Sequence, residues 1–120
     1  MLKDGLRYEA LALKFLQRHK LKLLERNFHS RYGEIDLIMM EQDTLVFVEV
    51  RYRKSDTFGS ATESITTGKQ RKIIKTAQIY IQKNELWHLN ARFDVIALSP
   101  SQKLLTSVNY EWLEAAFSID

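Results

Sequence analysis

Two short apolar runs in the first half of the chain are each interrupted by one carboxylate. Residues 35–40 and 45–50 are apolar apart from Asp36 and Glu49, and the polar segment 41–44 separates them. Apolar runs on either side of a short polar break are typical of a β-hairpin. Strands that are apolar on both faces need cover on both sides, so the pattern predicts a sheet sandwiched between helices.

A turn centred on residues 42–43 defines the pairing of this hairpin. It places Asp36 opposite Glu49, and strict alternation puts Ile35 on the same face as Leu37. A three- or five-residue loop would instead shift the register by one position. Directly opposed carboxylates repel each other, and a bound divalent cation is the simplest compensation, because hard cations are held by carboxylate oxygens.

Periodicity along the rest of the chain predicts further helices and strands. In chain order we expect a helix over 3–19, a strand over 21–28, the hairpin, a loop over 53–65, a helix from 66 or 67 to 83–84, a strand over 92–98, a strand over 104–108 and a final helix over 110–117 capped by Asn109. Thr67 and Gln70 have the spacing of a capping box at the start of the second helix. The predicted fold is a single α/β domain over residues 1–120, with a central mixed β-sheet flanked by helices.

Composition narrows the class of protein. The 120 residues suit one domain, and the absence of cysteine excludes disulfides and cysteine-based zinc sites. No apolar run approaches the roughly 20 residues of a membrane span, and the N-terminus lacks the apolar stretch of a signal peptide. We therefore expect a cytoplasmic protein with no membrane partner.

The charge is mildly basic, with 18 Lys and Arg against 15 Asp and Glu, and two basic segments follow the hairpin. Clustered basic residues are the electrostatic footprint of phosphate binding, although they are also common on solvated surfaces. The candidate nucleic-acid-binding residues are Arg51, Arg53, Lys54, Lys69, Arg71 and Lys72.

Two further carboxylates lie within apolar patterns. Glu9 falls in the apolar stripe of helix 3–19, where it either pairs at the rim with a base such as Arg7 or is directed at a site. Asp94 interrupts the apolar strand 92–98, where we expect a structural hydrogen bond across the sheet.

The order of the polar residues resembles that of the PD-(D/E)XK nucleases. Asp36 on one strand, Glu49-x-Arg51 on the next and Lys69-Gln70 at the start of a helix follow that arrangement, which belongs to the restriction-endonuclease-like fold. More closely, the chain is similar to the YraN family, a bacterial group within that fold that is similar to Holliday-junction resolvases. This resemblance runs from Leu6 to about Leu98 and rests on Gly33-Glu34-Ile35-Asp36-Leu37-Ile38, Phe47-Val48-Glu49-Val50, Phe58-Gly59 and Lys69-Gln70.

The resemblance implies an endonuclease that hydrolyses phosphodiester bonds in structured, branched DNA with Mg²⁺ or Mn²⁺. Asp36 and Glu49 would hold the metal, the Val50 backbone carbonyl would be a third ligand, and Glu9 would match the carboxylate that the first helix contributes near the metal. The implied catalytic set is Asp36, Glu49, Arg51, Lys69 and Gln70. Resolvase-like nucleases usually act as dimers, so a homodimer is expected.

Arg51 departs from the signature, which has lysine at this position, and Ile35 replaces its proline. Lysine can lose its proton and help to activate water, whereas arginine stays charged but can clamp a phosphate. Lys69 or another lysine could replace the missing one, or the metal alone could suffice. The alternatives are a nucleic-acid-binding protein that kept the fold without catalysis and a protein-interaction domain with a vestigial acidic pair. In the predicted register, a Glu34–Arg51 ion pair would be a purely structural use of the arginine.

Overall fold

The computed structural model describes residues 2–54, 65–101 and 107–119, with side chains from residue 5 onward. The elements are α1 (Leu2–Arg18), β1 (Lys22–Ser30), β2 (Gly33–Glu41), β3 (Thr44–Tyr52), α2 (Thr67–Lys83), β4 (Asn90–Pro100) and β5 (Val108–Phe117). The predicted order of elements is confirmed as far as β4. Neither helix in these ranges is long and apolar enough to cross a membrane.

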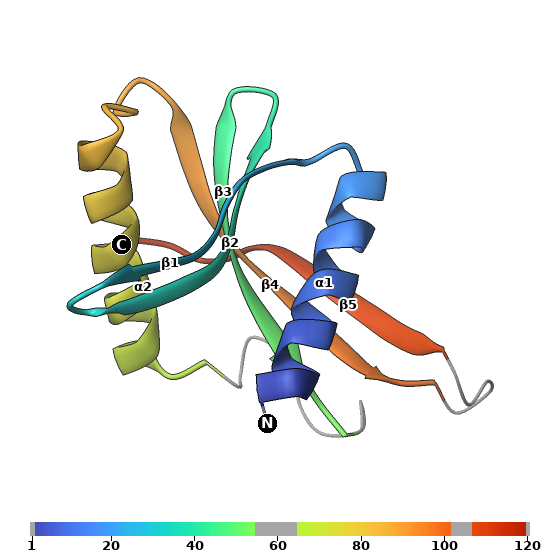
Figure 1. Ribbon diagram of the computed structural model, residues 1–120. Coiled ribbons are helices and arrows are strands. Elements are labelled where there is room, and N and C mark those ends of the chain that lie inside the picture. The colour runs from blue at the N-terminus through green and yellow to red at the C-terminus, as the bar shows by residue number, and fades with distance from the viewer. Residues whose placement is uncertain (1, 55–64, 102–106, 120) are drawn as a thin grey trace.

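The five strands form one mixed sheet in the order β1-β2-β3-β4-β5. β3 and β4 are parallel, whereas the other neighbouring pairs are antiparallel. Parallel neighbours need a long crossover connection, and α2 lies in the one that joins β3 to β4. The two helices lie on opposite sides of the sheet (Figure 1). The α/β fold predicted from the sequence is confirmed, and the arrangement is consistent with a restriction-endonuclease-like fold.

A hydrophobic core lies on each side of the sheet. Leu16 of α1 packs with Val48 and Ile96 on one face, and Ile73 of α2 packs with Phe47 on the other. All three sheet residues are at most 1% exposed. The prediction that the hairpin strands are covered on both faces is therefore confirmed.

The predicted register of the β2–β3 hairpin is confirmed over the paired part of the strands. Met40 pairs with Leu45, and the ladder continues to its last described pair, Leu37 with Val48. Asp36 lies one position beyond this pair. β2 and β3 therefore separate next to Asp36, and we call this point the fork.

Ile35 lies on the opposite face from the one predicted. It packs with Phe28 and Ile38 in the core beneath α2, whereas Leu37 packs in the core beneath α1. Strict alternation along β2 would have placed Ile35 and Leu37 together. The alternation breaks at Asp36, where β2 leaves β3 and remains paired with β1 alone.

The start of α2 differs by one residue from the predicted capping box. Thr66 is the N-cap, and its hydroxyl oxygen accepts the backbone N–H of Lys69 at 3.1 Å. The Gln70 side chain donates to the Ile65 carbonyl at 3.1 Å rather than completing a box with Thr67. The cap places Lys69 in the first turn of the helix, and this turn faces the fork.

The predicted final helix over 110–117 is wrong, because this segment is strand β5. Trp112 packs on the α1 side, whereas Leu113 and Ala116 pack on the α2 side. Ala115 between them has φ +52°, and the pairing with β4 is irregular there. This bulge changes the face that the chain presents and produces an apolar spacing that imitates a helical period.

Asn109, expected to cap that helix, instead pairs with Ser99 of β4. Of the expected strand 104–108, residues 104–106 lie outside the described residues and Val108 is the first residue of β5. Phe58-Gly59 and most of the expected loop also lie outside the described residues.

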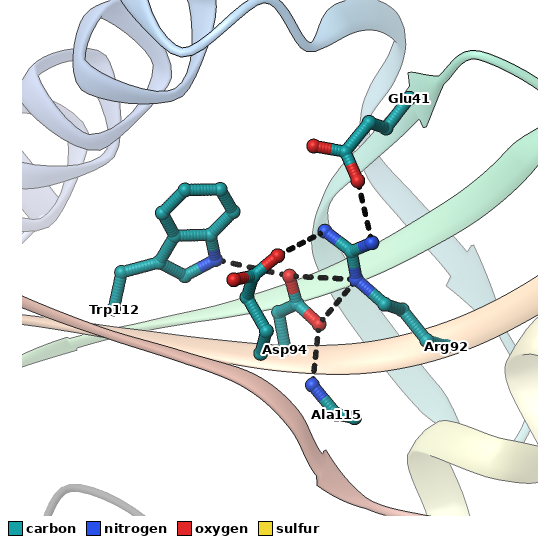
Figure 2. Close-up of polar contacts among 6 residues, drawn as sticks. Glu41, Arg92, Asp94, Trp112 and Ala115 are labelled. Carbon is teal, nitrogen blue, oxygen red and sulfur yellow. Dashed lines mark hydrogen bonds and ion pairs between the residues drawn. The ribbon is translucent and has the colours of Figure 1, made fainter.

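Asp94 has the structural role predicted for it. Its fully buried carboxylate accepts the Nε–H of Arg92 at 3.0 Å, the indole N–H of Trp112 at 2.9 Å and the backbone N–H of Ala115 at 2.9 Å. Arg92 also donates to Glu41 at 2.6 Å, and Figure 2 shows its guanidinium between the two carboxylates. This network ties β2, β4 and β5 together at the end of the sheet away from the fork.

Candidate functional site

The two carboxylates of the hairpin meet at the fork. The backbone N–H of Val50 donates to Asp36 Oδ2 at 2.8 Å, and the negative charge of Glu49 acts on the Asp36 carboxyl group. Glu49 is buried and Asp36 is half-buried. Two neighbouring carboxylates repel each other when both are ionised, and a proton on one of them or a nearby cation relieves this repulsion. The fork therefore holds an acidic pair that needs a proton or a cation.

The pKa of Asp36 shows how strongly the fork disfavours two negative charges. Burial, followed by the charge of Glu49, raises this pKa from 3.8 to about 7. The charge of Glu9 raises it further, and the hydrogen bond from Val50 lowers it without reversing the shift. A divalent cation can replace the proton, because it stabilises the ionised form of both carboxylates.

Two basic side chains contact the same oxygen of Glu49. Lys69 Nζ lies 3.3 Å and Arg51 Nε lies 3.7 Å from Glu49 Oε2. The structure thus brings together four of the five residues of the expected catalytic set, from β2, β3 and α2. The two bases also offset part of the negative charge of the acidic pair.

The Glu34–Arg51 ion pair expected from the hairpin register is wrong. Glu34 lies 3.4 Å from His29 and pairs with it across β1 and β2. The reason is the fork, because β2 has already separated from β3 at this position.

Glu9 reaches the same region from α1. Its Oε1 accepts the Nε–H of Arg26 and the Nδ2–H of Asn27, each at 3.1 Å, and the residue is only 6% exposed. Pairing with a base was one of the two sequence interpretations, but the base is Arg26 of β1 rather than Arg7. The charge of Glu9 also acts on Asp36, as the pKa of Asp36 shows. Direct coordination of a metal by Glu9 stays a prediction.

The donor set at the fork fits a hard cation that keeps part of its water shell. Within the described ranges, no three His, Cys, Asp or Glu side chains are grouped as a metal site. Asp36 and Glu49 therefore form a two-carboxylate set, and Mg²⁺ is commonly bound by one or two carboxylates, water and substrate phosphates. The Val50 carbonyl as a third protein ligand stays a prediction.

The remaining sequence candidates separate into exposed and engaged residues. Lys54, Arg71 and Lys72 are exposed. Arg53 lies 3.8 Å from Glu111, and only 15% of its side chain is exposed. Gln70 bonds to the backbone carbonyl of Ile65, so its described contact is with the helix start rather than with Asp36 or Glu49.

Sequence reasoning missed Arg26 and Asn27, the partners of Glu9. The signal was the imperfect alternation of the first strand. The imperfect alternation has two causes in the structure. The pairing of β1 with β2 shifts register between Leu23 and Glu25, and the backbone of Asn27 is left-handed, with φ +53°. Asparagine tolerates this conformation better than most residues. The irregular backbone turns both side chains toward α1.

Sequence reasoning also missed Arg31 and Lys75 as basic residues beside Tyr32, in the turn between β1 and β2. Arg31 Cζ and Lys75 Nζ each lie 5.0 Å from the centre of the Tyr32 ring, within cation–π range. They extend the basic surface of α2 toward the turn between β1 and β2. Their spacing in the sequence gave no indication of this proximity, because Tyr32 and Lys75 belong to different elements.

A cavity of about 790 Å³ opens on the α1 side of the fork. It is lined by Gly5, Leu6, Tyr8, Glu9, Asn27, His29, Glu34, Asp36, Val50 and Tyr52. The rings of Tyr8 and Tyr52 are stacked, with centroids 4.1 Å apart and planes inclined by 14°. The acidic pair is therefore adjacent to a space large enough for an organic ligand.

Comparison with known proteins matches this region of the chain to one family. The UPF0102 protein of Vibrio campbellii is 46% identical over 116 residues, covering 95% of this chain and 91% of the relative. The UPF0102 protein NE0719 of Nitrosomonas europaea is 48% identical over 109 residues, covering 91% and 88%. A family model described as "Uncharacterised protein family UPF0102" matches residues 8–98, a range that includes every residue of the fork. The chain therefore belongs to this family, UPF0102, which is the YraN family.

Proposed function

We propose that the protein is a metal-dependent endonuclease that hydrolyses phosphodiester bonds in structured, branched DNA, with Mg²⁺ or Mn²⁺ as cofactor. The observation that carries this proposal is the acidic pair at the fork, with Lys69 and Arg51 against Glu49. Two neighbouring carboxylates that are shielded from solvent, contact basic side chains and lie beside a cavity are characteristic of a functional site.

Asp36 and Glu49 would hold the metal. A bound divalent metal supplies an activated water and offsets negative charge on the phosphate. Lys69 contacts Glu49, yet 44% of its side chain is exposed, so the same ammonium group can also bind a phosphate oxygen. Such a cation would stabilise the charge that develops as the phosphodiester is attacked.

Arg51 would bind the phosphate rather than act as a base. Its guanidinium stays protonated in proteins and offers two parallel donors to a phosphate. With Arg51 limited to this role, any proton transfer by a protein amine falls to Lys69. Gln70 follows Lys69 in the first turn of α2, and its expected contact with phosphate or the attacking water stays part of the proposal.

The surface of α2 suits the phosphate backbone of DNA. Residues 67–83 contain five Lys and Arg residues and no Asp or Glu. Phosphate contacts of this kind supply affinity without sequence recognition. Lys54, Arg71 and Lys72 are exposed and available for such contacts, whereas Arg53 would have to exchange its partner Glu111 for a phosphate.

A cleavage assay on four-way junction, flap, duplex and single-stranded DNA tests the proposal. With Mg²⁺ or Mn²⁺ we expect cleavage of at least one branched substrate by the wild-type protein and none by Asp36→Asn. Chelation by EDTA should also stop cleavage. Equal cleavage by both proteins would point to a contaminating nuclease and refute the role of the fork.

A second candidate is a DNA-binding protein that has kept the nuclease fold without catalysis. Arg51 favours it, because the signature lysine is absent and Lys69 is already engaged by Glu49. Shifted bands in an electrophoretic binding assay, with no cleavage in Mg²⁺ or Mn²⁺, would support this alternative.

The proposal extends to assembly and location. Resolution of a four-way junction needs two cuts, so we expect a homodimer, which analytical ultracentrifugation with and without DNA would detect. Chromosomal DNA as substrate implies a cytoplasmic protein.

A further inference from the structure

The charges around the fork are divided between the two sides of the sheet. On the α1 side, the charged residues lining the cavity include the carboxylates Glu9, Glu34 and Asp36; Glu9 is paired with Arg26 of β1, and Glu34 with His29. On the α2 side lie the exposed basic residues of the helix. A backbone phosphate is therefore attracted more strongly to the basic surface of α2 than to the cavity, where carboxylates lie in the wall.

The cavity instead suits a neutral aromatic group. Tyr52 stacks on Tyr8 at its wall and remains 43% exposed, and the exposed Leu6 adds apolar surface at the same cavity. Nucleobases stack on aromatic side chains whatever their sequence, because every base has a π-face. The carboxylates can accept hydrogen bonds from base amino groups, as carboxylates do with cytosine.

We propose that this cavity receives an unpaired nucleobase of the DNA, next to the phosphodiester that lies at the acidic pair of Asp36 and Glu49. The substrate class is then DNA in which paired and unpaired strands meet, with the paired part following α2 and the unpaired nucleotide entering beneath α1. This inference rests on the proposed function, because the cavity and the acidic pair share Asp36.

The energetics favour such a junction over continuous duplex. A base within a duplex must be unstacked and unpaired before it can enter a pocket, at a cost of a few kcal/mol, and this cost is smallest for a base that is already single-stranded. A volume of about 790 Å³ lies within the range of small-molecule sites. A forked DNA can therefore occupy both surfaces at once, whereas a continuous duplex can occupy only α2.

Equilibrium binding tests this inference separately from cleavage. Fluorescence anisotropy would compare a forked DNA with a fully paired duplex of the same sequence, with Ca²⁺ in place of Mg²⁺. We expect the wild-type protein to bind the forked DNA more tightly than the duplex. Tyr52→Ala should weaken binding of the forked DNA by about 5- to 150-fold, which is the effect of losing one base stack. The same variant should bind the duplex as the wild type does. Tyr52→Phe keeps the ring and should retain the preference for forked DNA over duplex. The control is Trp87→Ala, which removes an aromatic residue that is 64% exposed and lies outside the cavity lining.

Gly5 offers a second variant that does not remove any packing. A Cβ added at Gly5 meets nothing within 4 Å, and replacing glycine within a helix favours the helix. Gly5→Phe should fill part of the cavity and reduce the preference for forked DNA, while binding of the duplex stays as in the wild type. Gly5→Ala, which adds a single carbon, should reduce the preference far less.

Two results would overturn the inference, and they are distinguishable. The wild-type protein could bind forked DNA and duplex with equal affinity, and Tyr52→Ala and Gly5→Phe could leave both affinities unchanged. This result would exclude base binding in the cavity while leaving the proposed nuclease function intact. Failure to bind either DNA would overturn both proposals together.

Discussion

Asp36→Asn is expected to stabilise the metal-free protein at alkaline pH, although it removes a residue of the proposed site. In the folded protein, the pKa of Asp36 is raised from 3.8 to about 7. Between these values the folded chain holds a proton that the unfolded chain has released, so wild-type stability falls as the pH rises through this window. At 1.36 kcal/mol per pH unit, the full penalty above pH 7 is about 4 kcal/mol.

Asparagine removes the charge and keeps the shape. Its carbonyl oxygen can still accept the Val50 N–H, and its amide can donate to Glu49. We therefore expect Asp36→Asn to match the wild type near pH 4 and to be more stable by up to about 4 kcal/mol near pH 8. Asp43→Asn is the matched control, because Asp43 is exposed at the turn of the same hairpin.

Urea unfolding followed by circular dichroism, with EDTA present and at both pH values, measures these differences. Marked destabilisation of Asp36→Asn at both pH values would show that Asp36 is structural and would refute the assignment of the fork as a metal site. A third series with Mg²⁺ adds an independent result. The cation should raise the unfolding free energy of the wild type near pH 8 but not that of the variant, since only a ligand bound to the folded state stabilises it.

Three further substitutions test the site and its support. Lys69→Ala should slow cleavage by about 100-fold, the typical loss for one stabilising donor, whereas Lys83→Ala at the far end of α2 should cleave as the wild type does; equal losses would indicate a general effect of charge. Arg51→Lys should leave the cleavage rate unchanged or lower it, because lysine loses the two parallel donors proposed to bind the phosphate; a raised rate would contradict this role and would mean that a titratable amine at this position restores dormant chemistry. Asp94→Asn should lower the unfolding free energy by about 3 kcal/mol in urea titrations, because Arg92 loses a buried ionic partner; a change below about 1 kcal/mol would contradict the role of this network.

The sequence predicted the part of the site that depends on neighbouring strands. Alternation and a short polar turn were enough to place Asp36 beside Glu49, because hairpin pairing is local. The position of Lys69 beside this pair was instead implied by the resemblance to the nuclease family, because periodicity alone does not say where a helix start lies relative to a sheet.

The errors arose where the backbone leaves ideal geometry. Ile35 changed face because β2 separates from β3, and no feature of the hydrophobic pattern specifies where a ladder ends. The apolar positions of the last strand imitate a helical period because the bulge at Ala115 shifts them, so the prediction of a helix there is wrong. The contact of Glu9 with Arg26 joins α1 to β1, and its geometry depends on how the helix packs on the sheet, which periodicity does not determine.

The parallel pairing of β3 with β4 has a consequence for how the protein folds. The meander from β1 to β3 is built from pairs close in sequence, whereas Thr44 of β3 pairs with Asn90 of β4. Closing a long loop costs entropy before the distant contacts form, so we expect the meander to form before β4 docks. The two carboxylates would then meet while the sheet is still incomplete, and Lys69 would arrive later with α2. A divalent cation present during refolding would thus act on the earliest structured part of the chain and accelerate folding rather than only slow unfolding.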